Sequence, residues 1–207
     1  MTTEPPPFTE FARDYLAGLK AAIDEIDPAS LERVMEVLLE AKRDRRTVYV
    51  LGNGGSAATA SHLASDLCRT EAGTGRRGLR AICLTDNVAA FTAVANDTGF
   101  ETAFAELLAL QVRQGDVVIA ISGSGSSPNV LQGVEVARRR GATTVALVGF
   151  GGGELAALVD HAVCLECRHY GVAEDLHLAL AHMIAIYMAG PRRIGQPDQR
   201  PGSSLDP

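Results

Sequence analysis

Residues 47–55 read TVYVLGNGG, and a second stretch with the same organisation, VVIAISGSGSSP, covers residues 117–128. Each stretch joins a short apolar run, rich in Val and Ile, to a turn of small polar residues. A segment with the apolar spacing of a helix follows each turn. The apolar runs do not alternate with polar residues, which is typical of strands covered on both faces of a parallel sheet. The two stretches therefore predict strand–turn–helix units of an α/β fold.

The same alternation extends along the chain. Apolar runs predict five strands, at residues 47–52, 79–85, 116–122, 143–149 and 161–167. Helical spacing predicts the segments between them and after the turns, at residues 56–69, 87–96, 100–114, 129–140 and 154–159. This alternation predicts a five-stranded parallel sheet, doubly wound and flavodoxin-like, with right-handed crossovers.

Three further helices are predicted outside these units, at residues 8–26, 28–45 and 173–188. The first carries an apolar stripe formed by Phe11, Tyr15, Leu16, Leu19, Ile23 and Ile26. This stripe needs a cover, and two alternatives stay open: the sheet of the same subunit, or the same helix of a symmetry-related copy.

The prolines outline the domain. Seven of the nine lie within the first seven or the last seventeen residues. We therefore expect residues 1–7 and 191–207 to be disordered, and residues 8–190 to form one domain with an N-terminal pair of helices.

Composition restricts the function classes. The 207 residues are 46% apolar and carry a net charge of −6, so the chain can bury a core but offers no basic surplus for nucleic acid or anionic lipid. No apolar run reaches the roughly 20 residues that span a membrane, and the start, MTTEPPPFTEF, does not resemble a signal peptide. Four cysteines do not make a disulfide scaffold in a chain of this length. We expect a cytoplasmic protein that binds neither nucleic acid nor membrane.

Two turns carry candidate ligand-binding groups, because ligands of open parallel sheets bind at the carboxyl ends of the strands. The turn at residues 52–56 brings backbone N–H groups and the Ser56 hydroxyl to a helix N-terminus, where an anion is favoured. The turn at residues 122–128 supplies four hydroxyls, and Ser127 before Pro128 fits a helix N-cap. Such residues also make ordinary tight turns. Two of them in one sheet favour a phosphate monoester site.

A dinucleotide site is the alternative for the first turn. Gly52, Gly54 and Ala57 match a loose dinucleotide fingerprint, and Asp86 follows the second strand where a ribose-binding acid would lie. However, the later strands lead into a serine cluster instead of an apolar slot for a nicotinamide. We therefore expect a phosphosugar and no nucleotide cofactor.

Acids and histidines form a third candidate group. His62 and Asp66 are four residues apart and share one helix face. In the last helix Glu174 and His182 lie on roughly one side, whereas His177 points elsewhere. A carboxylate and an imidazole brought together from two helices can transfer a proton or bind a metal ion, although a lone histidine is more often structural.

These features together resemble the sugar isomerase (SIS) domain proteins and, among them, the phosphoheptose isomerases. The resemblance runs from about residue 8 to about residue 190. Its motifs are LGNGGSAA (51–58), Ala95-Asn96-Asp97, ISGSGSSPNVLQ (121–132) and EDLHLALAH (174–182).

The resemblance implies an aldose–ketose isomerase that converts sedoheptulose 7-phosphate to D-glycero-D-manno-heptose 7-phosphate, and a homotetramer with sites between subunits. It implies Asp66 and His182 as the catalytic pair. It also implies a zinc site, as in metal-containing members, formed by His62, Asp66, Glu174 and His182. The substrate-binding residues that it implies are Asn53, Gly54, Ser56, Asp86, Ser122, Gly123, Ser124, Ser127 and Glu174.

The chain departs from the family pattern at several positions. Asp66 stands where the family has a glutamate, Glu174 stands in place of a glutamine, and Gly171 falls near a family aspartate. The serine turn also differs from the usual family sequence. Two alternatives therefore stay open: an isomerase for another sugar phosphate, or a non-catalytic protein that binds a phosphosugar or a protein partner, as replication-initiator-associating relatives do. For an enzyme, we expect the serine turn, Asp66 and His182 to open into one cavity, formed by one protomer or by neighbouring protomers together.

Overall fold

The computed structural model describes residues 5–69 and 78–190. It contains a five-stranded parallel sheet with the strand order β2-β1-β3-β4-β5. This is the order of the flavodoxin-like doubly wound fold, so the predicted fold class is confirmed. The predicted disordered tail at residues 191–207 and the first four residues lie outside the described part of the chain.

The strand bounds follow the predicted apolar runs closely in the centre of the sheet and less closely at its edges. The strands are β1 (Thr47–Gly52), β2 (Arg80–Cys83), β3 (Val117–Ser122), β4 (Thr143–Val148) and β5 (His161–Cys164). Every residue of β1 and β3 is buried, as their apolar sequences predict. The predictions for β2 and β5 were too long, because an edge strand has a pairing partner on one side only and the chain leaves it earlier.

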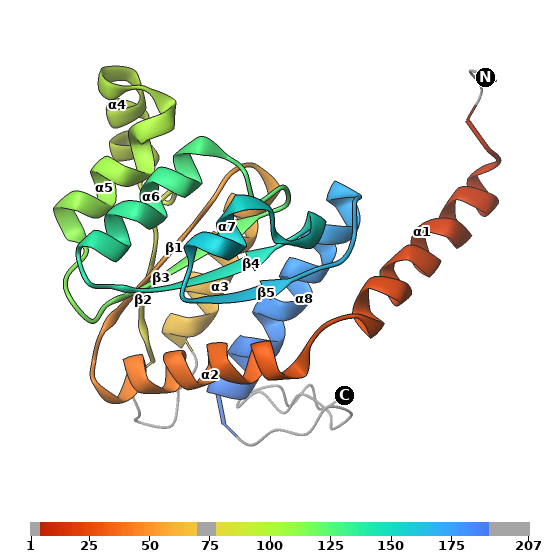
Figure 1. Ribbon diagram of the computed structural model, residues 1–207, viewed down its shortest axis with the longest axis horizontal. Helices are drawn as coiled ribbons and strands as arrows, with labels where there is room; N and C mark the ends of the chain where they lie inside the picture. The colour runs from red at the N-terminus through yellow and green to blue at the C-terminus, as the bar shows by residue number, and fades with distance from the viewer. Residues whose placement is uncertain (1–4, 70–77, 191–207) are drawn as a thin grey trace, which may run out of the picture.

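Helices cover both faces of the sheet (Figure 1). The helices of one face are α1 (Phe8–Asp24), α2 (Pro28–Arg43), α3 (Gly55–Arg69) and α8 (Tyr170–Met188). Those of the other face are α4 (Val88–Thr98), α5 (Ala103–Gln111), α6 (Pro128–Arg139) and α7 (Gly153–Leu158), with the short 3₁₀ turns Phe100–Thr102 and Phe150–Gly152. The helix predicted at residues 100–114 ends at Gln111, because Val112 adopts an extended backbone. Across residues 5–69 and 78–190, no helix combines the length and the apolar character that crossing a membrane requires.

Helix α1 extends away from the body of the molecule (Figure 1). Tyr15 and Leu19 pack against the core beneath it, and the Tyr15 hydroxyl donates a hydrogen bond to Asp175 of α8 at 2.7 Å. Phe11, Leu16 and Ile23 of the same predicted stripe remain exposed. Packing within the subunit therefore covers part of the stripe, and the cover for the rest stays open.

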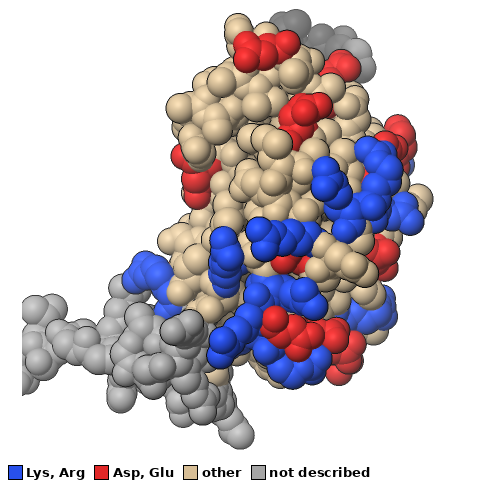
Figure 2. Space-filling model, turned by 90° about the vertical axis from the view of Figure 1, so that its left-hand side faces the viewer, with Lys and Arg blue, Asp and Glu red and all other residues tan. Residues whose placement is uncertain are grey.

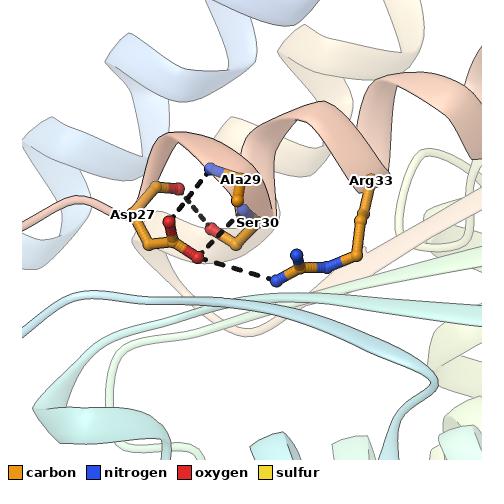
Figure 3. Close-up of polar contacts among 4 residues, drawn as sticks. All are labelled: Asp27, Ala29, Ser30 and Arg33. Carbon is orange, nitrogen blue, oxygen red and sulfur yellow. Dashed lines mark hydrogen bonds and ion pairs between the residues drawn. The ribbon is translucent and has the colours of Figure 1, made fainter.

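Asp27 determines where α2 begins (Figure 3). Its carboxylate accepts hydrogen bonds from the backbone N–H groups of Ala29 and Ser30, both at 3.0 Å, and lies 3.6 Å from Arg33. Pro28 occupies the first helical turn, where its missing N–H costs nothing. Asp27 thus satisfies two backbone donors that would otherwise have no partner inside the helix.

We expect Asp27→Ala to lower the free energy of unfolding by about 1 kcal/mol, because both capping hydrogen bonds are lost. Urea denaturation of the full chain measures this effect. Glu32→Ala, an exposed substitution on the same helix, is the control. A difference of only a few tenths of a kcal/mol between the two variants would show that the cap contributes little.

Candidate phosphosugar-binding and proton-transfer site

The two predicted turns meet at the switch point of the sheet. Strands β1 and β3 are neighbours, with Gly52 paired to Ile121 at their carboxyl ends. The turns that leave them are tied by reciprocal side-chain amide bonds: Asn53 donates to Asn129 at 2.8 Å, and Asn129 donates to Asn53 at 2.9 Å. Asn129 is 2% exposed, so this link is fixed inside the protein. Sequence reasoning gave Asn129 no role.

A cavity of about 130 Å³ lies between these turns. It includes seven of the nine substrate-binding residues that the resemblance implies, together with Ile121 and Tyr170. Those seven are Asn53, Ser56, Ser122, Gly123, Ser124, Ser127 and Glu174. Residues from three separate parts of the chain thus surround one small polar space.

The other two candidates, Gly54 and Asp86, do not line the cavity. Gly54 has a φ of 54°, a left-handed backbone that glycine adopts without strain, so its contribution is to the shape of the turn. Asp86 is exposed and lies three residues beyond the end of edge strand β2. The structure therefore does not bring Asp86 to the candidate site.

The serine hydroxyls differ in what they bind. The Ser122 hydroxyl oxygen accepts from the Gly125 N–H at 3.0 Å, and that of Ser124 accepts from the Ser126 N–H at 3.3 Å. These bonds shape the turn and leave the hydroxyl hydrogens able to donate to a ligand. Ser127 is the N-cap residue of α6, as predicted, yet its side chain makes no capping hydrogen bond. A donor set beside a helix N-terminus suits an anion.

Glu174 places its carboxylate at the N-terminus of α3, the helix that follows the first predicted turn. Its carboxylate lies directly against Gly55, the first residue of α3, where a Cβ atom would collide with it. The positive end of the α3 dipole favours this carboxylate. Of the two predicted anion cradles, the serine turn is thus the one left for a phosphate.

Tyr170 is a cavity residue that sequence reasoning missed. It begins α8, three residues before the predicted start of that helix, so no helical spacing singled it out. A Cβ atom at Gly123 would lie 2.9 Å from its ring. The ring also packs edge-to-face on Phe150, with a centroid distance of 4.7 Å. Phe150 has a φ of 50°, an uncommon backbone conformation for a bulky residue.

His62 and Asp66 of α3 lie close to His182 of α8, further along these two helices than the cavity. His62 Nε2 lies 3.2 Å from Asp66 Oδ2 and 3.1 Å from His182 Nε2. One ligand atom from each of the three residues fits within 4.8 Å of the others. Tetrahedral zinc places its ligand atoms about 3.3 Å apart, so this set of two nitrogens and one oxygen fits such an ion with a fourth position open.

Two parts of the expected arrangement are not seen within one chain. Glu174 does not belong to the potential metal-binding group, because its carboxylate lies at the N-terminus of α3. Asp66 and His182 do not line the serine cavity, so the single shared cavity is not seen within one chain. The spacing explains both results: His62 is seven residues beyond Gly55, which at 1.5 Å per residue is about 10 Å along α3.

His177 points away from this group, as its helical position predicts. It is fully buried, and neither ring nitrogen has a hydrogen-bond partner. Burial lowers the pKa of His177 from 6.5 to about 4, so the ring is neutral near pH 7. This histidine is a buried residue of α8, and it does not line the serine cavity.

Comparison with known proteins agrees with the motifs. Residues 10–149 match the SIS domain family. The chain is 38% identical over 174 residues to the phosphoheptose isomerase of Chlorobaculum parvum, a match that covers 82% of each chain. Solved phosphoheptose isomerases from Francisella tularensis and Neisseria gonorrhoeae superimpose with TM-scores of 0.81 and 0.78, at 25% and 27% identity. These matches cover 88% and 87% of this chain and 96% of each structure.

Proposed function

The chain belongs to the SIS domain family, and on this premise we propose that it is a phosphoheptose isomerase, which interconverts sedoheptulose 7-phosphate and D-glycero-D-manno-heptose 7-phosphate. The observation that carries the proposal is the arrangement of two polar groups along α3 and α8. One is the hydroxyl-lined cavity between the serine turn and the first residues of both helices, and the other is the carboxylate and imidazole cluster further along them.

The phosphate binds at the serine turn. Ser122, Ser124 and Ser127 donate hydroxyl hydrogens to its oxygens, and the N-terminus of α6 lies behind them. The hydrogen bonds between Asn53 and Asn129 hold the turn in register with α3. Fixing this end of the sugar orients its other end toward the reactive groups.

The reaction moves two protons, and Asp66 and His182 suit this task. One of them removes a proton from C1 of the ketose while the other delivers a proton to the oxygen on C2, which forms an enediol. Return of a proton to C2, with loss of the proton on the C1 oxygen, completes the aldose. His62 contacts both partners, so it fixes their relative orientation.

A zinc ion is part of the proposal, because His62, Asp66 and His182 offer a suitable donor set. An atom that ligates the ion does not transfer a proton at the same time, so a bound ion would act in place of proton delivery to the carbonyl oxygen: it would polarise the substrate carbonyl and stabilise negative charge on its oxygen. Metal analysis of the purified protein tests this assignment.

The size of the site favours a long sugar. Along α3, Gly55, which follows the turn after β1, lies about 10 Å from His62, and an extended chain of single bonds advances about 1.2 Å per bond. Seven bonds separate C2 from phosphorus in a heptulose 7-phosphate, a reach of about 8 Å. A triose phosphate has three such bonds between C2 and phosphorus and reaches only about 4 Å.

We further propose that a second copy completes the site, in a homotetramer. His62 is exposed on the outer face of α3, and Met183 and Ile186 of α8 are exposed beside the same helix pair. The exposed part of the α1 stripe supplies a further apolar contact surface.

The four described cysteines are free thiols, which suits the reducing cytoplasm that the sequence predicts.

Incubation with sedoheptulose 7-phosphate, followed by NMR, tests the function. We expect the aldose 7-phosphate to accumulate, and C5 and C6 ketose phosphates to turn over more slowly. Turnover of another sugar phosphate alone would identify an isomerase of different specificity. Binding of the heptulose without turnover would favour a non-catalytic phosphosugar-binding protein.

Ser127→Ala separates ligand binding from helix capping. Because the Ser127 hydroxyl makes no capping bond, we expect little change in stability, within about 0.5 kcal/mol. Loss of a hydrogen bond to a charged phosphate should raise KM by about tenfold or more. Steady-state kinetics and urea denaturation measure the two effects, with the exposed Ser65→Ala as control. A destabilised variant with unchanged KM would contradict this assignment.

A further inference from the structure

A second cavity, of about 380 Å³, lies at the opposite edge of the sheet from the serine turn. We call it the amino-end cavity, because its residues lie at or just before the amino ends of β1, β2 and β3. Four arginines line it: Arg45 and Arg46 before β1, Arg80 at the start of β2, and Arg113 before β3. The length of β1 separates the two cavities, a distance of about 17 Å.

The acids that line this cavity are already engaged. Asp116 is 5% exposed, and its two carboxylate oxygens accept backbone hydrogen bonds from Thr47 and Arg113, each at 2.9 Å. Asp44 pairs with the side chain of Arg43 at 3.1 Å. Within residues 5–69 and 78–190, none of the four lining arginines has a carboxylate within 4 Å. Their positive charges are therefore available to a ligand.

The backbone holds part of this arginine group in place. Arg46 donates to the Gln114 carbonyl at 3.2 Å, and its guanidinium lies against Gly115, where a Cβ atom would come within 2.9 Å of Cζ. Gly115 has a φ of 84°, so glycine is favoured there on two counts. Arg45 adopts a φ of 56°, a left-handed conformation that is uncommon outside glycine.

The buried Tyr49 lines the same cavity as the remaining two arginines, Arg80 and Arg113. Its hydroxyl donates to the Gln111 carbonyl at 3.0 Å. Burial and the charge of Asp116 raise the pKa of Tyr49, against the opposing charges of Arg80 and Arg113, which line the cavity with it. The cavity therefore combines a hydrogen-bonded tyrosine with four arginines.

The basic character of this face contrasts with the whole chain. Figure 2 shows Lys and Arg side chains gathered across the side of the molecule that carries the amino ends of the strands. The full sequence has a net charge of −6, whereas four arginines and two aspartates line this cavity. A small anion approaching this face meets a local positive potential.

We propose that the amino-end cavity binds a phosphate-bearing anion, such as a phosphate or diphosphate ester, as a site separate from the sugar-phosphate cavity. Guanidinium groups match the geometry of phosphate oxygens through paired hydrogen bonds. The volume of about 380 Å³ lies in the range of small-molecule sites. Leu110 and Ile82 add an apolar wall that accommodates the organic part of an ester.

Calorimetric titration of the full chain with inorganic pyrophosphate tests this site. We expect the variant carrying Arg80→Gln and Arg113→Gln to bind pyrophosphate at least about tenfold more weakly than the wild type. Arg33→Gln with Arg139→Gln, two exposed arginines on helices, is the matched control and should bind as the wild type does. Wild-type affinity should fall as NaCl is raised.

The outcomes distinguish this site from the serine turn. Binding that survives Ser127→Ala but is lost in the Arg80→Gln, Arg113→Gln variant supports the amino-end cavity. The same variant should retain wild-type turnover of sedoheptulose 7-phosphate, so a failed isomerase assay would not affect this result. Equal pyrophosphate affinity in the wild type and the arginine variant, or no binding to the wild type, would overturn the proposal.

Discussion

Asp66→Asn and His182→Gln should each lower kcat for sedoheptulose 7-phosphate by about 10²- to 10⁴-fold, the usual contribution of a positioned acid or base. Both substitutions keep the approximate size of the side chain. Because the two residues are joined through His62, we expect the double variant to be little slower than the worse single variant. NMR assays at saturating substrate give kcat for each variant.

Measurements of stability and of bound zinc distinguish structural, metal-binding and catalytic roles of His62, Asp66 and His182. Asp66 and His182 are half-buried, so both variants should unfold near the wild-type urea midpoint. His62→Gln should reduce bound zinc, measured on the purified protein, together with kcat. Ser65→Ala, next to Asp66 and exposed, is the control. If either Asp66→Asn or His182→Gln kept more than about a tenth of wild-type kcat, proton transfer by this pair would be rejected.

Features set by local sequence were predictable. The strands β1 and β3 and the turns after them follow from apolar runs that end in small polar residues, and parallel strands bring such turns to one edge. Helical spacing alone placed His62 next to Asp66, and placed His177 apart from His182. These relations depend on residues within one element or on the regular geometry of the sheet.

Features set by contacts between distant segments were not predictable. The position of Glu174 against Gly55 depends on how α8 packs on α3, and spacing within α8 indicated only which side of the helix it faces. Tyr170 enters the cavity through a turn that precedes the predicted helix. The amino-end cavity combines arginines from three separate segments, none of which is a motif by itself. Tertiary packing decides each of these positions.

Acid should destabilise this protein through His177. The unfolded chain binds a proton at this residue near pH 6.5, but the native state does so only near pH 4, because the buried ring has no hydrogen-bond partner to stabilise its charge. Between these values the unfolded state binds more protons, so stability falls as the pH is lowered. A shift of this size corresponds to a loss of about 3 kcal/mol by pH 4, and about 2 kcal/mol of it between pH 7 and pH 5.

His177→Leu tests this linkage because leucine has no charged form. Urea denaturation at pH 7 and pH 5, at one protein concentration, should show that the variant loses about 2 kcal/mol less than the wild type over this interval. Leu180→Ala, one turn along the same buried helix face, is the control. It should lower the free energy of unfolding at both pH values, and the change between pH 7 and pH 5 should equal that of the wild type. If the free energy of unfolding changed equally between pH 7 and pH 5 in His177→Leu and in the wild type, protonation of His177 would not be what destabilises the protein in acid.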